Sequence, residues 1–139
     1  MKTKTLFLFL FAAFILFTGS CNTDFPDNGT PGNGGTVDRR LKFLGTWNVS
    51  DQPARLNYVV TIEKHPLYED KVNLKNFADL GGRAVGLVVG NTIVVDEQVI
   101  VGDYKVEGTG SYINASKMNF DFFIDDGIDK VLRKAVFTK

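Results

Sequence analysis

The side chains best suited to nucleophilic catalysis are a single histidine and a few serines. His65 is the only histidine, and it stands directly before Pro66, which favours an extended backbone at position 65. No nucleophile-elbow pattern surrounds Ser50, Ser111 or Ser116. A zinc site needs more protein ligands than one histidine supplies. The sequence therefore predicts an exposed His65 that takes part in neither catalysis nor metal binding.

Three aspartates surround Gly127 near the C-terminus, namely Asp125, Asp126 and Asp129. Calcium takes six to eight oxygen ligands, but this spacing does not fit an EF-hand loop, and no glutamate follows at the closing position. Asp-Gly is also a preferred hairpin turn, so a turn is favoured over a metal site. Only geometry identifies a catalytic carboxylate pair, so that alternative stays open. The prediction is a protein without cofactor or metal ion that is not an enzyme.

Cys21 is the remaining reactive side chain, and its position shortly after an apolar segment indicates its role. It is the only cysteine, so it cannot form a disulfide within the chain. Lys2 and Lys4 precede an apolar run over residues 6–17, which is shorter than the roughly 20 residues of a membrane-spanning helix. Small residues then lead to Cys21. A positive start, a short apolar run and small residues before a cleavage point predict a secretory signal peptide over residues 1–20.

The residues before Cys21 resemble the lipobox of bacterial lipoproteins, in which the thiol takes a diacylglycerol before the leader is removed. Thr18 stands where leucine is commonest, and lipoproteins of the Bacteroides group tolerate such variants. The resemblance implies that Cys21 is the lipid attachment site and that the membrane is a partner of the protein. The alternative is an ordinary signal peptide that ends beside an unrelated cysteine. Asn22 follows the cysteine in place of the aspartate that retains lipoproteins in the inner membrane of enteric bacteria, so the resemblance favours the outer membrane.

Residues 21–40 are predicted to form a flexible tether, because they are rich in glycine and proline and nearly free of apolar side chains. Removal of the leader takes away two of the 16 basic residues and none of the 16 acidic ones, which leaves a net charge of −2. A mildly acidic chain has no electrostatic footprint for nucleic acid. No nucleic-acid partner is therefore expected.

Residues 41–139 read as one all-β domain, because short β-branched and aromatic runs alternate with turn residues. The connections after Gly82 are short, which predicts an antiparallel meander. Such a meander removes its exposed edges by closing into a barrel of about eight strands. The alternating phenylalanines of residues 118–124 are expected to pack against Gly108 and Gly110. The predicted strands cover residues 45–50, 56–64, 72–77, 84–89, 92–95, 98–101, 104–113, 117–125 and 130–138.

Gly45-Thr46-Trp47 at the first strand and Arg133 in the last strand resemble the calycin superfamily of lipocalins, fatty-acid-binding proteins and avidins. The resemblance implies a barrel that is closed at one end by Trp47, with a basic side chain from the final strand, here Arg133, crossing the indole. A guanidinium over an indole contributes roughly 0.5–2 kcal/mol. The chain as a whole is similar to small lipocalin-like lipoproteins of Bacteroides-type bacteria, which implies a fold and a location but no binding residues.

Two functions follow from this reading. The first is a binding module that takes a small apolar or amphipathic ligand in the mouth of the barrel. The alternative is a structural or interaction subunit of an envelope protein complex, with a filled barrel. Four apolar residues stand on strand faces that are predicted to be polar and exposed, namely Val59, Val88, Val94 and Phe123. A contiguous exposed apolar patch would favour the protein partner, and an open interior pocket would favour the ligand.

Overall fold

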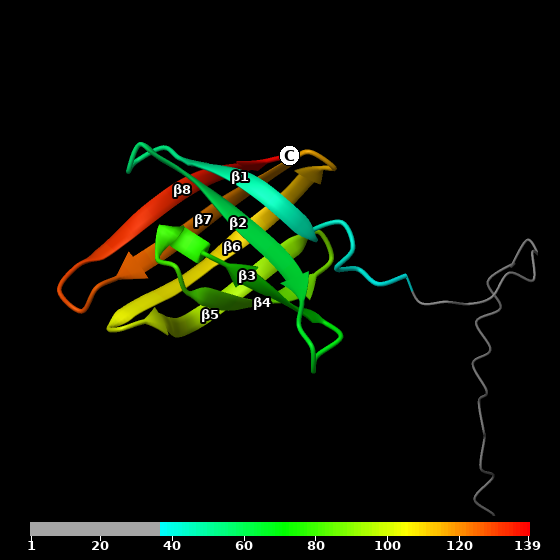
Figure 1. The fold of residues 1–139 in the computed structure, drawn as a ribbon, viewed down its shortest axis with the longest axis horizontal. Helices are drawn as coiled ribbons and strands as arrows, with labels where there is room; N and C mark the ends of the chain where they lie inside the picture. Colours follow the sequence, from blue (N-terminus) through cyan, green and yellow to red (C-terminus); the bar gives the residue numbers. More distant parts are fainter. Residues whose placement is uncertain (1–36) are drawn as a thin grey trace, which may run out of the picture. The chain divides into compact units, whose positions relative to one another are not determined.

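The computed structural model describes residues 37–139, which form eight strands that close into an antiparallel barrel (Figure 1). Each strand pairs with the next along the chain, and β8 returns to pair with β1. The predicted meander barrel is confirmed. No helix within residues 37–139 is long and apolar enough to cross a membrane. The elements are β1 (Gly45–Asp51), β2 (Leu56–Lys64), β3 (Lys71–Lys75), the 3₁₀ turn η1 (Phe77–Asp79), β4 (Arg83–Val89), β5 (Thr92–Val101), β6 (Tyr104–Asn114), β7 (Lys117–Asp125) and β8 (Lys130–Thr138).

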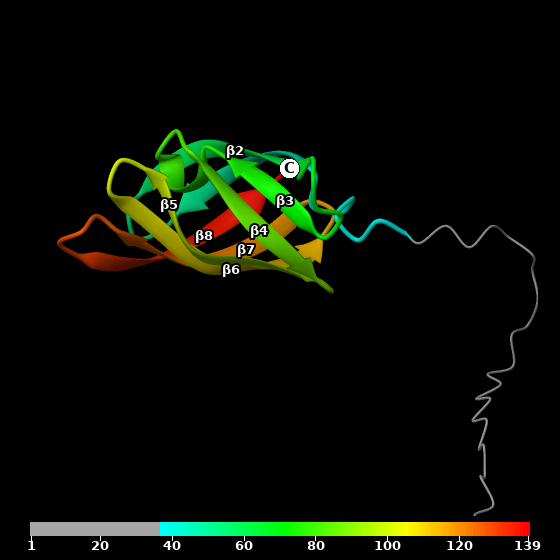
Figure 2. The same cartoon turned by 90° about the horizontal axis from the view of Figure 1, so that it is seen from below.

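The connections between strands lie at two opposite ends of the barrel, which we call the base and the tip. The base holds residues 37–44, the connections 65–70, 90–91 and 115–116, and Lys139. The tip holds the connections 52–55, 76–82, 102–103 and 126–129. Figure 2 shows the β7–β8 hairpin projecting at the tip, on the side away from the first described residues.

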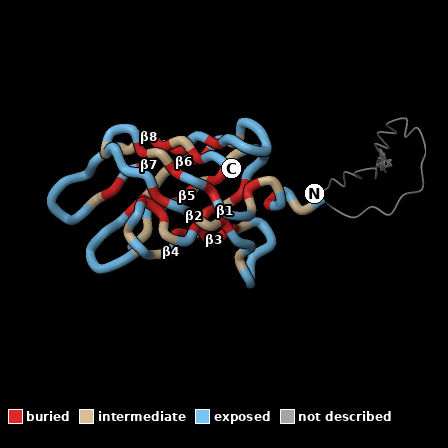
Figure 3. Tube along the Cα trace, turned by 45° about the horizontal axis from the view of Figure 1, so that its top comes forward, coloured by how far each residue is buried: buried red, intermediate tan, exposed pale blue. Residues whose placement is uncertain are grey.

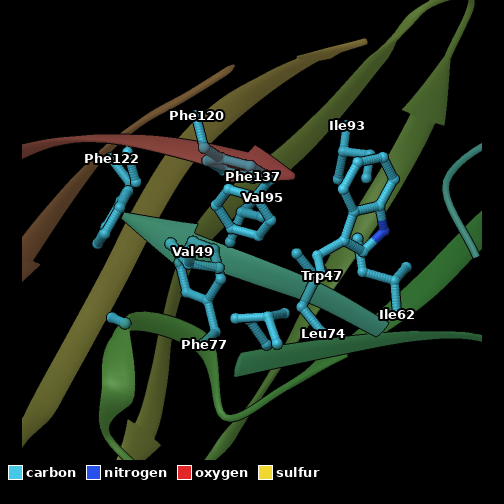
Figure 4. Packing of buried hydrophobic residues seen from close by; sticks show 14 of the residues in the cluster. Trp47, Val49, Ile62, Leu74, Phe77, Ile93, Val95, Phe120, Phe122 and Phe137 are labelled. Carbon is cyan, nitrogen blue, oxygen red and sulfur yellow. The ribbon is translucent and has the colours of Figure 1, made fainter. Parts of the chain in front are cut away.

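Every strand contributes apolar side chains to the interior. Figure 3 shows buried positions along the strands, and Figure 4 shows the packing of the largest side chains. Buried and exposed residues alternate along β7, as expected of a strand with one face in the core. The ring of Phe77 lies 5.1 Å from that of Phe120 and 4.9 Å from that of Phe122, between ring centroids. The Phe120 and Phe137 rings are 5.5 Å apart. These contacts join β7, β8 and η1 inside the barrel.

Two glycines of β6 make room for this aromatic row. Gly108 is the register partner of Phe122, and Gly110 that of Phe120. A Cβ added at Gly110 would lie 2.3 Å from the Phe120 ring, and one added at Gly108 would lie 2.4 Å from the Phe122 Cβ. The predicted packing of the phenylalanine row against the glycine row is confirmed.

Both ends of the barrel are covered by the chain itself. At the base, Phe43 is fully buried, and Arg40, only 8% exposed, donates to the Tyr68 carbonyl at 2.8 Å and pairs with Asp38. The packed part of the chain therefore begins before residue 41, where the domain was predicted to start. At the tip, η1 directs Phe77 into the core.

The structure corrects two details of the predicted strands. Residues 92–101 form one strand, β5, and its pairing with β6 shifts register between Val95 and Gln98. The Gln98 amide bonds both the N–H and the C=O of Val85, at 2.7 and 2.8 Å, where β4 and β5 have separated. Residues 76–79, with left-handed backbone at Asn76, Ala78 and Asp79, form η1 and its cap instead of extending β3.

Candidate functional site

Trp47 lies fully buried at the base, on the seam where β1 meets β8. Its indole N–H donates to the carbonyl of Phe43 at 2.7 Å. The cation over its ring is the ammonium of Lys139, 4.2 Å from the centroid. The same ammonium donates to the Leu44 carbonyl at 2.6 Å. Trp47 thus holds two segments against the barrel, the one with Phe43 through a hydrogen bond and the one with Lys139 through its ring face.

The expected contact between Arg133 and Trp47 is wrong. Val49 pairs with Phe137, so continuing the same register places Trp47 beside Lys139, whereas Arg133 lies nearer the tip. There the Arg133 guanidinium donates to Asp51 at 3.0 Å, and Asp51 is only 2% exposed. Arg133 does bridge the two strands of the seam, but it does so through a buried carboxylate.

Tyr58 adds an unpartnered polar group close to this ion pair. It faces inward from β2, and its hydroxyl is buried with no hydrogen-bond partner among the described residues. Burial raises the pKa of Tyr58, the charges of Asp51 and Asp79 raise it further, and Arg133 opposes them. Asp51, Arg133 and Tyr58 form a polar cluster on the inner face near the tip, which we call the tip cluster.

The second feature of the tip is an open strand edge. β7 pairs with the whole of β8, but β1 reaches only the Ala135–Thr138 part of β8. The Gln52 N–H donates to the Lys134 carbonyl at 3.1 Å, so the backbone groups of Lys134 point away from β7. The N–H and C=O groups of every second residue along a strand point to the same side. The backbone groups of Lys130 and Leu132 therefore also point away from β7. No described strand pairs with that side of residues 130–133.

Apolar side chains accompany this edge. Leu132 is exposed on the outer face and is the register partner of Phe123, which is also exposed. The ammonium of Lys130 lies 5.3 Å from the Phe123 ring centroid and pairs with Glu107. Val131 is exposed on the opposite face, and Ile128 at the turn is 89% exposed. We call residues 128–133 together with Phe123 the β8 edge.

The four apolar residues singled out in the sequence do not form one patch. Val88 is buried inside the barrel, so its assignment to the outer face is wrong. It shares the inner face of β4 with Ala84 and Gly86. Val59 lies on β2, and Phe123 lies on β7, so these two exposed residues belong to different parts of the surface. The sequence pattern found Phe123 but missed its neighbours, because free edges depend on relative strand lengths.

The aspartates around Gly127 form a turn, as favoured from the sequence. Asp126 accepts hydrogen bonds from the N–H groups of Ile128 and Asp129, at 2.9 and 2.8 Å, and these bonds lower its pKa. His65 is half-buried at the base and lies 4.9 Å from the Tyr68 ring. Within residues 37–139, no group of three or more His, Cys, Asp and Glu side chains is placed to hold a metal ion. Cys21 lies outside the described residues.

The comparisons with known proteins concern the fold alone. No protein-family model matches the chain, and no curated protein matches it. One solved structure, a redesigned beta barrel, is similar with a TM-score of 0.51 and 15% sequence identity. The similarity covers 76% of this chain and 97% of that chain. It supports the barrel and carries no information about a ligand or partner.

Proposed function

We propose that the protein is a lipid-anchored, non-enzymatic interaction module of the cell envelope, which binds an extended segment of a partner protein along the β8 edge. The observation that carries the proposal is the unpaired stretch of β8 beyond β1. An extended segment that adds to such an edge gains backbone hydrogen bonds and places alternate side chains in contact. The anchor is the lipid on Cys21, and the outer membrane is its proposed location.

The filled interior supports an outer binding surface. Trp47, Phe120 and Phe137 are fully buried, and with the rest of the core they occupy the space in which a barrel of eight strands holds a small ligand. Residues 38–44 and η1 cover the two ends. We therefore favour the interaction subunit over the ligand carrier. From the resemblance of the Gly45–Trp47 stretch, we also propose that the barrel is of the calycin type.

The chemistry of the edge defines the partner. An apolar side chain of the partner would pack against Leu132, and acidic side chains would pair with the lysines at 130 and 134. A second copy of β8 would bring lysines against lysines, and lysine on an edge strand disfavours such self-pairing. We propose a different protein that presents an extended segment of alternating acidic and apolar residues.

The test uses a photo-crosslinking amino acid at position 123 in the cells that produce the protein. We expect an adduct with one protein, and none from position 119, which is exposed beside Val136, in the part of β8 that is already paired with β1. Leu132→Pro removes an N–H that points away from β7, whereas Leu132→Thr keeps it. The adduct should disappear in the first variant and persist in the second. Equal adducts in both variants would contradict strand addition.

A second candidate function is favoured by the tip cluster. The buried Tyr58 hydroxyl lacks a partner and lies close enough to Arg133 to feel its charge, and the polar head of a small amphipathic ligand would supply the missing hydrogen bond. Native mass spectrometry of the chain purified from its own cells tests this. A retained small molecule that is lost in Tyr58→Phe would support the ligand carrier, and an apo mass would exclude it.

A further inference from the structure

The base of the barrel exposes apolar side chains around the point where the described chain begins. Val37 and Leu41 line one hollow, and Leu67 and Tyr68 line a neighbouring one that also includes Arg40. All four apolar side chains are exposed, Leu67 by 80%. They lie in residues 37–44 and in the connection 65–70, which Arg40 joins by its bond to the Tyr68 carbonyl.

We propose that the base is a membrane-contact surface, which rests on the head groups of the bilayer that holds the lipid anchor. This inference rests on the proposed anchor at Cys21. Val37 follows Cys21 by sixteen positions, and a chain of that length reaches at most about 55 Å. Tethering at this distance keeps the bilayer at a high effective concentration, so a small apolar surface is enough to hold the barrel down.

The charges of the two ends favour the same orientation. The connections of the tip carry four aspartates, at 79, 103, 126 and 129, and one basic residue, Arg55. The base segments carry Arg39, Arg40, Lys42 and Lys139 against Asp38, Glu69 and Asp70. An anionic membrane surface attracts basic segments near it and repels acidic ones. The base therefore fits such a surface better than the tip does.

Tyr68 supplies the side chain that is typical of a membrane–water boundary. Its ring is half exposed, and the ammonium of Lys71 lies 4.5 Å from its centroid. Tyrosine places an apolar ring and a polar hydroxyl at head-group depth, and a neighbouring lysine can reach phosphate from the same position. With the base on the bilayer, the β8 edge at the opposite end stays free for a protein partner.

The test couples the chain from Cys21 to Lys139 to vesicles through its single thiol, using a maleimide lipid. The vesicles contain phosphatidylcholine with brominated acyl chains and a minority of phosphatidylglycerol. A reporter tryptophan is introduced by Leu67→Trp, and the matched control is Ile128→Trp at the tip, where the native residue is 89% exposed. Trp47 is fully buried and gives the same background in both chains.

We expect bromine to quench the emission of the tryptophan at 67 and to leave that at 128 unchanged. The quenching should weaken in high salt or without phosphatidylglycerol, because screening removes the charge preference. Equal quenching at both positions, or none at 67, would overturn the proposal. A soluble dimer of the uncoupled chain, detected by sedimentation, would also overturn the proposal if Leu67→Asp dissociated it. In that case a second copy of the chain, and not a membrane, would cover the base. The coupling is chemical and does not depend on lipid attachment in cells. Failure of the membrane contact is therefore distinguishable from absence of a lipid on Cys21.

Discussion

Trp47 shows how one residue can join parts of the chain that are far apart in sequence. Its indole touches Phe43 through a hydrogen bond and Lys139 through its ring face, so it links the first described residues to the last. We expect a double-mutant cycle of Trp47→Leu and Lys139→Met to give a coupling of about 0.5–2 kcal/mol in the free energy of unfolding. The measurement is urea denaturation.

The control cycle replaces Lys139→Met with Arg133→Met. Arg133 lies beside Asp51 and not beside Trp47, so its coupling to Trp47 should fall within about 0.5 kcal/mol of zero. Arg133→Met alone should cost about 3–5 kcal/mol, because it leaves the buried Asp51 carboxylate unpaired. A strong Trp47–Arg133 coupling would restore the contact first expected from the sequence.

Tyr58 makes the stability of the fold depend on alkaline pH. Burial raises its pKa in the folded protein above the value of about 10 for an exposed tyrosine. Below pH 10 both states keep the proton, and stability is unaffected. Above pH 10 the unfolded chain loses the proton first, so stability falls by up to about 1.4 kcal/mol per pH unit.

Tyr58→Phe is the variant that isolates this effect. At neutral pH we expect it to be neutral or stabilising, because the hydroxyl it removes is buried without a partner. Between pH 10 and the folded pKa, the urea midpoint of the variant should fall less steeply than that of the unchanged chain. Parallel curves for the two proteins would show that Tyr58 ionises as freely in the fold as in water.

At the scale of elements, the pairing of β6 with β7 depends on the two glycines that face the phenylalanine row. Gly110→Ala would press on the edge of the Phe120 ring, which can turn, and we expect a cost of about 1–3 kcal/mol in the free energy of unfolding. Gly108→Ala would meet the backbone of Phe122 and the Asp121 carbonyl as well, so it should cost more.

The control for this pair is Thr109→Ala, which changes the residue between the glycines on the outer face. It should alter stability by less than about 0.5 kcal/mol. Chemical denaturation of the three variants gives the order directly. A cost at Gly108 no greater than at Gly110 would show that β6 moves away from β7 as a unit.

The elements themselves were largely predictable from the sequence, and their relative lengths were not. Alternation over residues 117–125 identified β7 and its inner face, because each buried position is apolar. The Gln98 bridge and the left-handed turn at Asn76 escaped prediction, because a side chain that replaces strand pairing leaves no periodic signal. The β8 edge was missed for a related reason: it exists only because β1 ends at Asp51, opposite Ala135.

At the scale of the molecule, the two surfaces for which we propose contacts lie at opposite ends of the barrel. The base holds the first described residues, the basic segments and the exposed Leu67. The tip holds the acidic turns and the β8 edge, on the opposite side of a packed core. A packed core holds these two surfaces at a fixed separation, because close-packed protein interiors resist deformation. Such a body suits a spacer that presents one end to a partner and the other to a membrane.

The lipid that we propose on Cys21 is the part of this arrangement that a single substitution can remove. Each buried CH₂ contributes roughly 0.8 kcal/mol, so a lipid with two or three acyl chains holds the protein permanently. We expect Cys21→Ala to abolish labelling with radioactive palmitate and to move the chain into the soluble periplasmic fraction, while Asn22→Ala keeps both properties. Sequencing the N-terminus shows whether the leader has been removed, because an uncleaved leader would itself hold the chain in the membrane. Membrane association of a leaderless Cys21→Ala chain would mean that the base alone binds the bilayer, and the lipid would lose its role.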